Sequence, residues 1–219
     1  MKVDTMKILG SPYVGLFAVA NDNICLVPNG IRDEEIKKIE ETLEVKTIKI
    51  SFYESSLLSV FGCMNNKKIF LPANVAPRET EQIEKEIKVE IINTQNALGN
   101  LVAVNDFGAI ISKTLTSEVA KQIKASGLNV AQTNIAEREV VGSAIAATSN
   151  AFVMNPNASK EEVKKVQETL NVKGGFATAN SGDALIRNSI VANSKGFVAG
   201  SLTTGHELNR IEESLGGGK

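Results

Sequence analysis

Residues 159–170 read SKEEVKKVQETL, and this stretch decides the fold because its pattern returns along the chain. The apolar residues Val163, Val166 and Leu170 recur at helical spacing, which predicts a helix that lies with one face on a core. Charged residues fill the other positions, as is typical of a solvated helix face. Recurrence of such a unit indicates a repeat architecture.

Four other stretches show the same amphipathic pattern. They are DEEIKKIEETL (33–43), RETEQIEKEI (78–87), SEVAKQIKASG (117–127) and TGHELNRIEESL (204–215). The central apolar residues of the five predicted helices lie 44, 40, 43 and 45 residues apart, and they are Ile39, Ile83, Ile123, Val166 and Ile211. Spacing this regular favours five copies of one structural unit.

Residues at the helix ends support these assignments. In a capping box a hydroxyl accepts from an orphan amide and a carboxylate reaches back, and two helix starts match it: Ser159 with Glu162, and Thr204 with Glu207. Ser117 is a simpler N-cap candidate, and Gly127 suits a helix end.

A hairpin-like stretch precedes each helix. The five are LFAVANDNICLVP (16–28), VFGCMNNKKIFLP (60–72), LVAVNDFGAIIS (101–112), AIAATSNAFVMNP (144–156) and SIVANSKGFVAG (189–200). Each has two apolar runs around a polar pair, and the pairs are Asn21-Asp22, Asn65-Asn66, Asn105-Asp106, Ser149-Asn150 and Asn193-Ser194. Because Asn and Asp tolerate the positive φ angles of tight hairpins, two antiparallel strands are predicted in each stretch.

A third apolar run follows four of the helices, at 45–51, 89–94, 129–133 and 172–179. No such run follows the fifth helix, but a spare strand-like segment, residues 6–9, precedes the first hairpin. We expect this segment to complete the fifth unit, because closing a ring removes exposed sheet edges.

The predicted fold class is therefore α+β, with five quasi-identical β-β-α-β repeats in a closed ring, a five-bladed β/α propeller. A single domain, 1–219, is expected. The repeats span approximately 14–56, 57–98, 99–140, 141–185 and 186–216, with 6–9 closing the fifth unit. An ordinary open α+β domain is the alternative.

Composition narrows the class of protein. Hydrophobic residues make up 42% of the chain, and no apolar run approaches the length of a membrane span. The first ten residues lack the apolar region of a signal peptide, so a cytoplasmic protein is expected. Lys and Arg number 24 against 25 Asp and Glu, so any RNA contact should be secondary to a protein contact.

The chain lacks the residue sets of common enzymes. Cys25 and Cys63 lie in apolar runs and are expected to be buried free thiols rather than a disulfide. The absence of a Cys/His cluster and of a phosphate-binding glycine motif argues against a metal site and a nucleotide cofactor. The single histidine, His206, is expected to be solvated in the first turn of the last helix. No catalytic residue and no cofactor are expected.

Several stretches resemble the translation initiation factor six family. The most specific is NALGN (96–100) followed by VND (104–106), and others are GSPYVG (10–15), FLP (70–72), VGS (141–143) and ATANSGD (177–183). The resemblance covers essentially the whole chain, in order. It implies the pentein fold, a ring of five β-β-α-β units. Pentein enzymes modify guanidinium groups with a Cys nucleophile, a His and a carboxylate, and such a hydrolase or deiminase is the alternative function.

The resemblance implies a non-enzymatic ribosome anti-association factor. Family members bind the large (50S) ribosomal subunit, chiefly ribosomal protein uL14 near the sarcin–ricin loop, with a minor rRNA contact. They prevent premature association with the small subunit and accompany large-subunit biogenesis. Eukaryotic members carry a long C-terminal tail that this sequence does not show, and an Arg in place of Val60, so the resemblance is to the archaeal type. A monomer is expected, and a ring-shaped scaffold with another partner is a third possibility.

The resemblance also indicates one face of the ring. In the family, the residue that matches Asn100 lies at the contact with the large subunit, whereas the residue type alone would suggest a turn that bonds its own backbone. Aligning the predicted first strands places related residues at the mouth where those strands begin, opposite the hairpin turns. The expected ribosome-binding residues are Gly15, Val60, Gly99, Asn100, Ser143 and Asn188. For the glycines at this mouth, backbone permissiveness is the leading interpretation.

Overall fold

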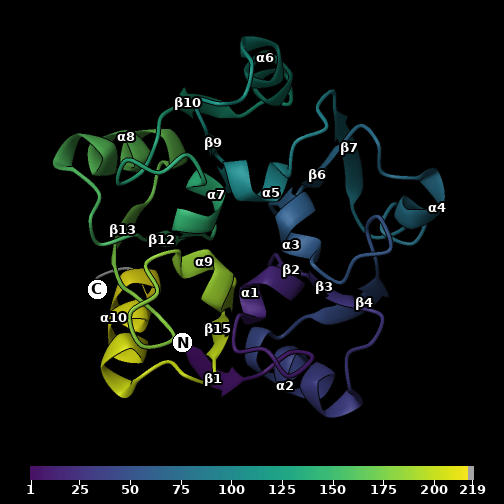
Figure 1. Cartoon of the computed structure of the whole chain (residues 1–219), viewed down its shortest axis with the longest axis vertical. Helices are drawn as coiled ribbons and strands as arrows, with labels where there is room; N and C mark the ends of the chain where they lie inside the picture. The colour runs from purple at the N-terminus through teal and green to yellow at the C-terminus, as the bar shows by residue number, and fades with distance from the viewer. Residues whose placement is uncertain (217–219) are drawn as a thin grey trace.

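Five three-stranded sheets surround a central axis in the computed structural model, which describes residues 1–216 (Figure 1). Positions 217–219 of the predicted domain lie outside the described residues. The inner strands are β2 (Val19–Ala20), β5 (Cys63–Met64), β8 (Val102–Val104), β11 (Ile145–Ala147) and β14 (Ile190–Ala192). The middle strands are β3 (Ile24–Pro28), β6 (Lys68–Pro72), β9 (Gly108–Ile111), β12 (Ala151–Met154) and β15 (Gly196–Gly200). The outer strands are β4 (Lys46–Ile50), β7 (Lys88–Ile92), β10 (Asn129–Gln132), β13 (Lys173–Phe176) and β1 (Lys2–Met6).

Each sheet is built in the same way. The inner strand pairs antiparallel with the middle strand, and the middle strand pairs parallel with the outer one. A parallel pair needs a crossover connection, and in four units a helix after the middle strand supplies it. The helices that follow the five middle strands are α2 (Asp33–Leu43), α4 (Pro77–Thr80), α6 (Ser117–Ala125), α8 (Lys160–Leu170) and α10 (Gly205–Leu215). The predicted β-β-α-β order and the α+β class are confirmed.

The helix starts agree with the sequence in detail, with two exceptions. Both predicted capping boxes form, on α8 and α10. The cap of α6 is Thr116 rather than Ser117, because the Thr116 hydroxyl accepts from the amide of Val119 at 3.4 Å. The helix predicted at 78–87 shrinks to the single turn of α4, where the Thr80 hydroxyl donates to the carbonyl of Pro77 at 2.9 Å. This bond competes with regular helical pairing.

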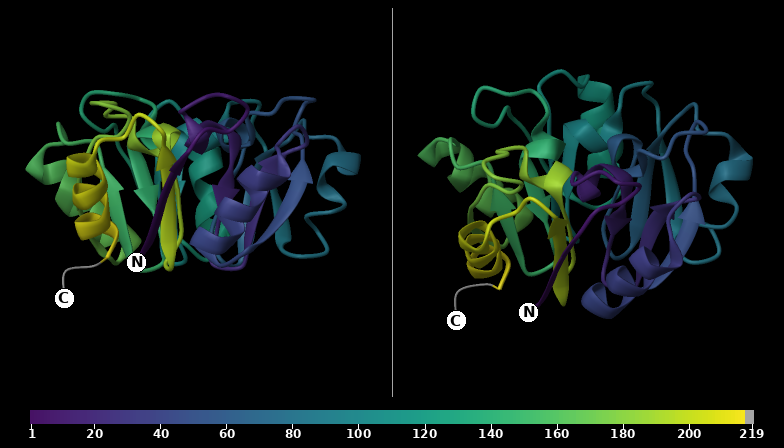
Figure 2. Two further views of the ribbon diagram at one scale, coloured as in Figure 1. Left: turned by 90° about the horizontal axis from the view of Figure 1, so that it is seen from below. Right: turned by 60° about the horizontal axis from the view of Figure 1, so that its bottom comes forward.

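The fifth unit is completed from the other end of the chain, but by an earlier segment than predicted. Strand β1 pairs in parallel with β15, starting with Lys2 opposite Gly196. The predicted closing segment 6–9 is wrong because the chain turns there. Leu9 and Gly10 adopt positive φ angles of 51° and 80°, which a strand does not accommodate. The N-terminus therefore lies at the end of the ring opposite this turn (Figure 2).

The buried apolar side chains form five clusters, and each lies between two neighbouring units. Ile39 and Leu43 of α2, for example, pack with Val27 of β3 and with Val198 of β15 in the fifth unit. The central helix residues that the sequence singled out are all 0% exposed. A single unit cannot bury its own helix face, so the repeats stabilise one another.

A four-residue helix precedes each inner strand. These are α1 (Val14–Phe17), α3 (Leu58–Phe61), α5 (Leu98–Leu101), α7 (Val141–Ala144) and α9 (Ile186–Ser189). The predicted hairpins began inside these helices, and those starts are wrong because a short apolar run suits a strand and a helix equally. Helices this short persist only through packing. Each contacts the short helices of two other units, and α1 contacts both α3 and α9. The surface that they form with the turns before them is called the short-helix face (Figures 1 and 2).

Candidate functional site

The bounds of the short helices align their residues between units. The second residues are Gly15, Ser59, Gly99, Gly142 and Arg187. The third residues are Leu16, Val60, Asn100, Ser143 and Asn188. The alignment from sequence placed Ser143 and Asn188 as the second residues of the last two units, and Ala144 and Ser189 as the third. It was therefore one residue out of register in these two units. The short-helix face nevertheless contains every predicted ribosome-binding residue.

The second residues are small where the helices approach each other most closely. A Cβ atom on Gly99 would lie 1.9 Å from the carbonyl oxygen of Ser59, and one on Gly15 would lie 1.8 Å from that of Arg187. Neither glycine has a positive φ angle. The fold therefore uses the missing side chain and not the permissive backbone, which corrects the interpretation from sequence.

Asn100, the residue at the centre of the family resemblance, is partly exposed on α5. Its Oδ1 accepts a hydrogen bond from the Ser143 hydroxyl on α7 at 3.2 Å. Its backbone N–H donates to the carbonyl of Ala97 at 3.1 Å. The side chain thus bonds to the next unit and not to its own loop. Among residues 1–216, its amide nitrogen Nδ2 has no hydrogen-bond partner, so this donor is available to another molecule.

The predicted ribosome-binding residues differ in exposure. Three are partly exposed and can touch a partner directly: Val60, Asn100 and Asn188. Three are buried between the helices: Gly15, Gly99 and Ser143. Gly15 and Gly99 allow the short helices to approach closely, and Ser143 bonds to Asn100. These three buried residues can therefore act on the face only through their neighbours. Their role in binding stays a prediction.

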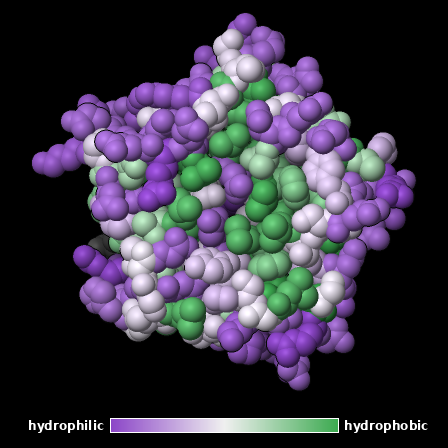
Figure 3. All heavy atoms as spheres, viewed as in Figure 1, coloured by the Kyte–Doolittle hydropathy of each residue, from purple (hydrophilic) through white to green (hydrophobic). Residues whose placement is uncertain are grey.

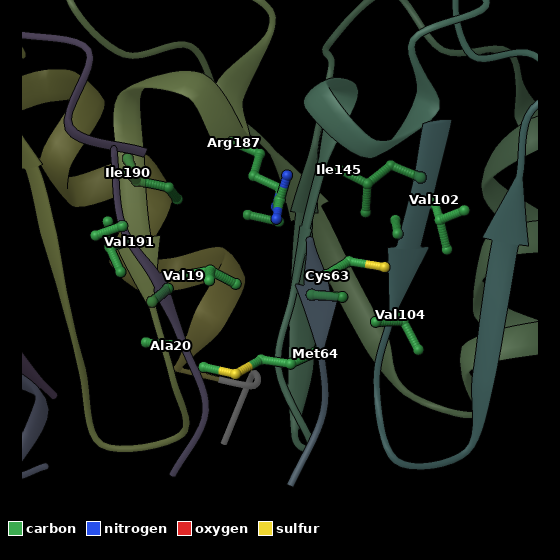
Figure 4. A pocket seen from close by; sticks show the side chains of 15 residues that line it. Val19, Ala20, Cys63, Met64, Val102, Val104, Ile145, Arg187, Ile190 and Val191 are labelled. Carbon is green, nitrogen blue, oxygen red and sulfur yellow. The ribbon is translucent and has the colours of Figure 1, made fainter. Parts of the chain in front are cut away.

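Arg187 is a residue that the sequence analysis missed. Its side chain extends from α9 into the space between the inner strands, which is called the central channel (Figure 4). Nη1 donates to the carbonyl oxygens of Ser59 at 3.1 Å and Gly99 at 3.0 Å, and Nη2 donates to that of Gly62 at 3.3 Å. Burial lowers the pKa of this guanidinium, and the nearby Cys63 thiol opposes the shift.

A count along the sequence could have found this arginine. Six residues before the first residue of each hairpin turn lies a Gly or Ser in four units, and Arg187 in the fifth. A charged residue in a series of small ones indicates a special role at that position. The signal was missed because the alignment of the first strands placed Asn188, and not Arg187, beside Gly15, Ser59 and Gly99.

A cavity of about 40 Å³ continues from Arg187 between the inner strands (Figure 4). Its walls are mostly Ala, Val and Ile side chains. Its volume equals that of about three or four water-sized spheres at about 10–15 Å³ each. Cys63 also lines it, and burial raises the pKa of this thiol to about 12 although Arg187 opposes the shift. The thiol therefore stays protonated at neutral pH and is a poor nucleophile.

The opposite end of the inner strands is closed by buried asparagines. The Nδ2 group of Asn21 donates to the carbonyl of Asn65, that of Asn65 to Asn105, and that of Asn105 to Thr148, at 3.0, 2.9 and 3.2 Å. In the fifth unit, Asn193 donates to Asn21 at 3.1 Å. The prediction of positive φ at these turns is wrong, because the side-chain oxygens bond the following amides instead. In the fourth unit Thr148 takes this place, one residue before the predicted pair.

A second polar ring lies beside the first. Asp22 accepts from the amide of Ser194 at 2.8 Å and from Nδ2 of Asn66 at 2.7 Å, and the Ser149 hydroxyl donates to Asp106 at 2.7 Å. Burial alone would raise the pKa of Asp22, but the bonds from Ser194, Asn66 and Ser149 outweigh it and hold the pKa below its ordinary value. The polar groups at this end are therefore largely paired within the protein.

The turns before the short helices form the rim of the short-helix face. Their sequences hold four carboxylates and two cations: Glu54, Glu137, Glu139 and Asp183, with Lys7 and Arg138. The rim also exposes the large apolar side chains of Leu9 and Tyr13, at 41% and 42%. Nearer the axis, apolar side chains gather over and beside α3 and α5 (Figure 3). The face thus has an apolar centre and a mainly acidic rim.

The residues that an enzyme of the pentein type would need are not arranged for catalysis. His206 is exposed in the first turn of α10, and both cysteines are buried free thiols, as predicted. Within residues 1–216, no group of three or more His, Cys, Asp or Glu side chains could hold a metal ion. In the same described part of the chain, no helix is long and apolar enough to cross a membrane.

The chain is an α+β repeat protein of five units, in which Arg187 extends into the central channel. The sequence profile of the eIF-6 family matches residues 3–214, and the chain belongs to this family. "Translation initiation factor 6" of Pyrococcus horikoshii is 33% identical over 99% of this chain and 99% of the relative. That of Methanocaldococcus jannaschii is 34% identical over 94% of this chain and 95% of the relative. The family resemblance is confirmed, and the chain is a translation factor.

Two solved structures show distant likenesses. An amidinotransferase from Microseira wollei, SxtG, has a TM-score of 0.42 and 12% identity, covering 53% of this chain and 38% of that one. The DDAH of Pseudomonas aeruginosa, in complex with citrulline, has a TM-score of 0.43 and 12% identity, covering 94% of this chain and 73% of that one.

Proposed function

We propose that this protein binds the large (50S) ribosomal subunit, prevents its premature association with the small subunit and takes part in large-subunit biogenesis. It acts in the cytoplasm as a monomer, without a cofactor and without catalysing a reaction. Membership of the eIF-6 family and the names of the relatives support a role in translation initiation.

We choose the short-helix face as the binding surface because the hydrogen bonding of side-chain amides differs between the two ends of the ring. At the hairpin end, side-chain amides donate to backbone carbonyls of neighbouring units, as those of Asn21, Asn65 and Asn105 do. At the short-helix face, the partly exposed Asn100 keeps its Nδ2 donor without a partner among the described residues. Apolar side chains gather over and beside α5, the helix that carries Asn100 (Figure 3). An apolar centre with a few placed polar groups is the anatomy of a protein interface.

The charge of the rim favours a protein as the main partner. Four carboxylates against two cations leave the rim with net negative charge, which disfavours RNA phosphates, whose binding needs Lys and Arg. The same rim attracts a basic protein surface. Ribosomal protein uL14 near the sarcin–ricin loop, the partner that the family resemblance implies, is the proposed contact, with rRNA touching the protein only to a minor extent.

The buried thiols support a non-enzymatic protein. Burial raises the pKa of Cys63 to about 12, and the Arg187 guanidinium occupies the end of the channel beside it. His206 is exposed on α10, a helix outside the inner strands (Figure 1). A cysteine–histidine hydrolase needs the two side chains within hydrogen-bond reach of each other.

Co-sedimentation with purified ribosomal subunits tests the proposal. The protein should pellet with large subunits and not with small ones, and adding it before mixing should reduce the yield of joined ribosomes. Sedimentation with small subunits alone, or normal subunit joining at saturating protein, would contradict the proposed function.

A further inference from the structure

Arg187 connects three units at the centre of the short-helix face. Its guanidinium, on the fifth unit, donates to the carbonyls of Ser59 and Gly62 on the second unit and of Gly99 on the third. Gly99 immediately precedes Asn100 in α5. A four-residue helix forms almost no internal hydrogen bonds, so its carbonyls need donors from elsewhere. One side chain supplies three of them.

The same carbonyls are fixed from the other side by backbone packing. A Cβ on Gly99 would lie 1.9 Å from the oxygen of Ser59 and 2.7 Å from that of Gly62, so the backbone of α5 contacts both. The backbone of Arg187 is held in turn, because its own carbonyl lies 1.8 Å from the Cβ position of Gly15. The backbone of Arg187 is thus held by α1, while its guanidinium bonds to both α3 and α5. A small shift of the guanidinium would move both helices.

The arginine breaks the fivefold pattern at this position, where the other units have Gly or Ser. A Gly or Ser at position 187 would leave the carbonyls of Ser59, Gly62 and Gly99 facing an apolar cavity without this donor. A guanidinium fits because its planar fork reaches several acceptors at once. The two helices that it contacts carry Val60 and Asn100, which are partly exposed.

We propose that Arg187 is a positioning residue for large-subunit binding, which fixes the relative placement of α3 and α5 and thereby of Val60 and Asn100. This inference rests on the proposed function. Arg187 is itself partly exposed, but its guanidinium bonds the backbone of the short helices. The inference assigns to these bonds control over the placement of Val60 and Asn100, and the exchange rates at those two amides separate this role from a direct contact with the partner.

The test compares Arg187→Met with Lys195→Met. Lys195 also joins the fifth unit to the first, since its Nζ donates to the carbonyls of Asp22 and Glu44 at 2.9 Å each, but it does so at the hairpin end. Binding is measured by titrated co-sedimentation with large subunits. Amide hydrogen exchange is followed at Val60 and Asn100. Their N–H groups donate to the residues that precede the two helices, to the carbonyls of Leu57 and Ala97 at 3.2 and 3.1 Å.

Arg187→Met should weaken large-subunit binding about tenfold and speed exchange at the two amides about tenfold. Lys195→Met, at a temperature well below the melting points of both variants, should change neither quantity more than about twofold. A folded Arg187→Met protein with normal binding and normal exchange would overturn the inference, as would an equal loss of binding in Lys195→Met.

Two further outcomes are separable. If Arg187→Met does not fold, Arg187→Lys decides, because a single ammonium group keeps one donor centre and should give intermediate binding and exchange; wild-type values for both would overturn the inference. If the wild-type protein sediments with neither subunit, the proposed function fails, and the binding role of Arg187 fails with it. The exchange rates would then still show whether Arg187 holds α3 and α5.

Discussion

The hydroxyl of Ser143 donates to the side-chain oxygen of Asn100 across 3.2 Å, so the third residues of two successive short helices are bonded to each other. Ser143 is 3% exposed and Asn100 is partly exposed, so the serine supports the asparagine, and the asparagine can reach another molecule. The bond occupies one side of the amide and leaves Nδ2 as a donor. A single amide of this kind can account for much of the specificity of an interface.

Asn100→Ala should weaken large-subunit binding about tenfold or more, because losing a central polar contact costs about 2 kcal/mol and leaves the partner's acceptor unpaired. The melting temperature should change little, since the side chain makes one hydrogen bond to the protein. Co-sedimentation and thermal melting measure the two effects. Normal binding by a stable Asn100→Ala protein would show that another surface meets the ribosome.

Asn105→Ala is the matched control at the other end of the strand. Asn105 is 2% exposed, and its side chain donates to Thr148 and Leu170 and accepts from Phe107 and Gly108. Leaving such buried groups unpaired costs about 1–3 kcal/mol, so this variant should melt earlier. Below its melting point it should bind large subunits normally.

Gly99→Ala should destabilise the fold, because the new Cβ would lie 1.9 Å from the carbonyl oxygen of Ser59. Overpacking of this kind costs about 1–3 kcal/mol. Gly205→Ala is the control, since a Cβ at that position in the first turn of α10 meets nothing within 4 Å. The control should be neutral or stabilised by up to about 1 kcal/mol. Denaturant unfolding of both variants decides, and equal stability would refute the close-packing account.

Deleting residues 1–6 should destabilise the whole protein. The deletion removes β1, exposes the edge of β15 and takes away Met6, which packs with α2 in the cluster between the first and fifth units. An exposed edge should also promote aggregation. Lys2→Ala removes an exposed ion pair with Glu44 and an exposed hydrogen bond to the carbonyl of Glu41, and should change stability by less than about 1 kcal/mol. Unchanged melting of the deletion variant would contradict the role assigned to β1.

Glu207→Gln should lose stability at neutral pH but not in acid. Burial alone would raise the pKa of Glu207, but bonds from Thr204, Thr178 and the amide of Gly182 outweigh it and lower the pKa. A lowered pKa in the folded state means that the carboxylate stabilises the fold above its unfolded pKa. That contribution is lost as pH falls through the folded pKa. Melting temperatures from pH 7 downward should therefore converge for the two proteins below the ordinary value of 4.5, and a constant difference would refute the linkage.

His206→Ala should leave binding and stability unchanged, within about 0.5 kcal/mol, because the side chain is exposed at a helix start. Loss of ribosome binding from this change alone would revive the enzymatic alternative.

Much of the fold could be predicted from local sequence. The stripe around Val166 and the capping box of Ser159 and Glu162 depend on residues within two helical turns, so they can be read directly. The short helices could not be predicted, because a run such as VGLF satisfies strand and helix patterns alike and four residues have no helical stability of their own.

The candidate site could be predicted only in part. Asn100 was found through a family resemblance, whereas its bond to Ser143 joins residues 43 positions apart. Arg187 was missed because its three acceptors lie 88 to 128 positions away. Its neighbours in sequence carry no sign of those contacts.

The sequence by itself determined the repeat, its period, the amphipathic helices and the order of strands, because hydrophobic periodicity and helix capping act over a few residues. Only the tertiary structure decided that Lys2–Met6 completes the fifth sheet, that the short helices form at all, and that Arg187 holds α3 and α5 together. These features depend on contacts between units distant in the chain, whose free energy exists only when all five units are packed around the axis.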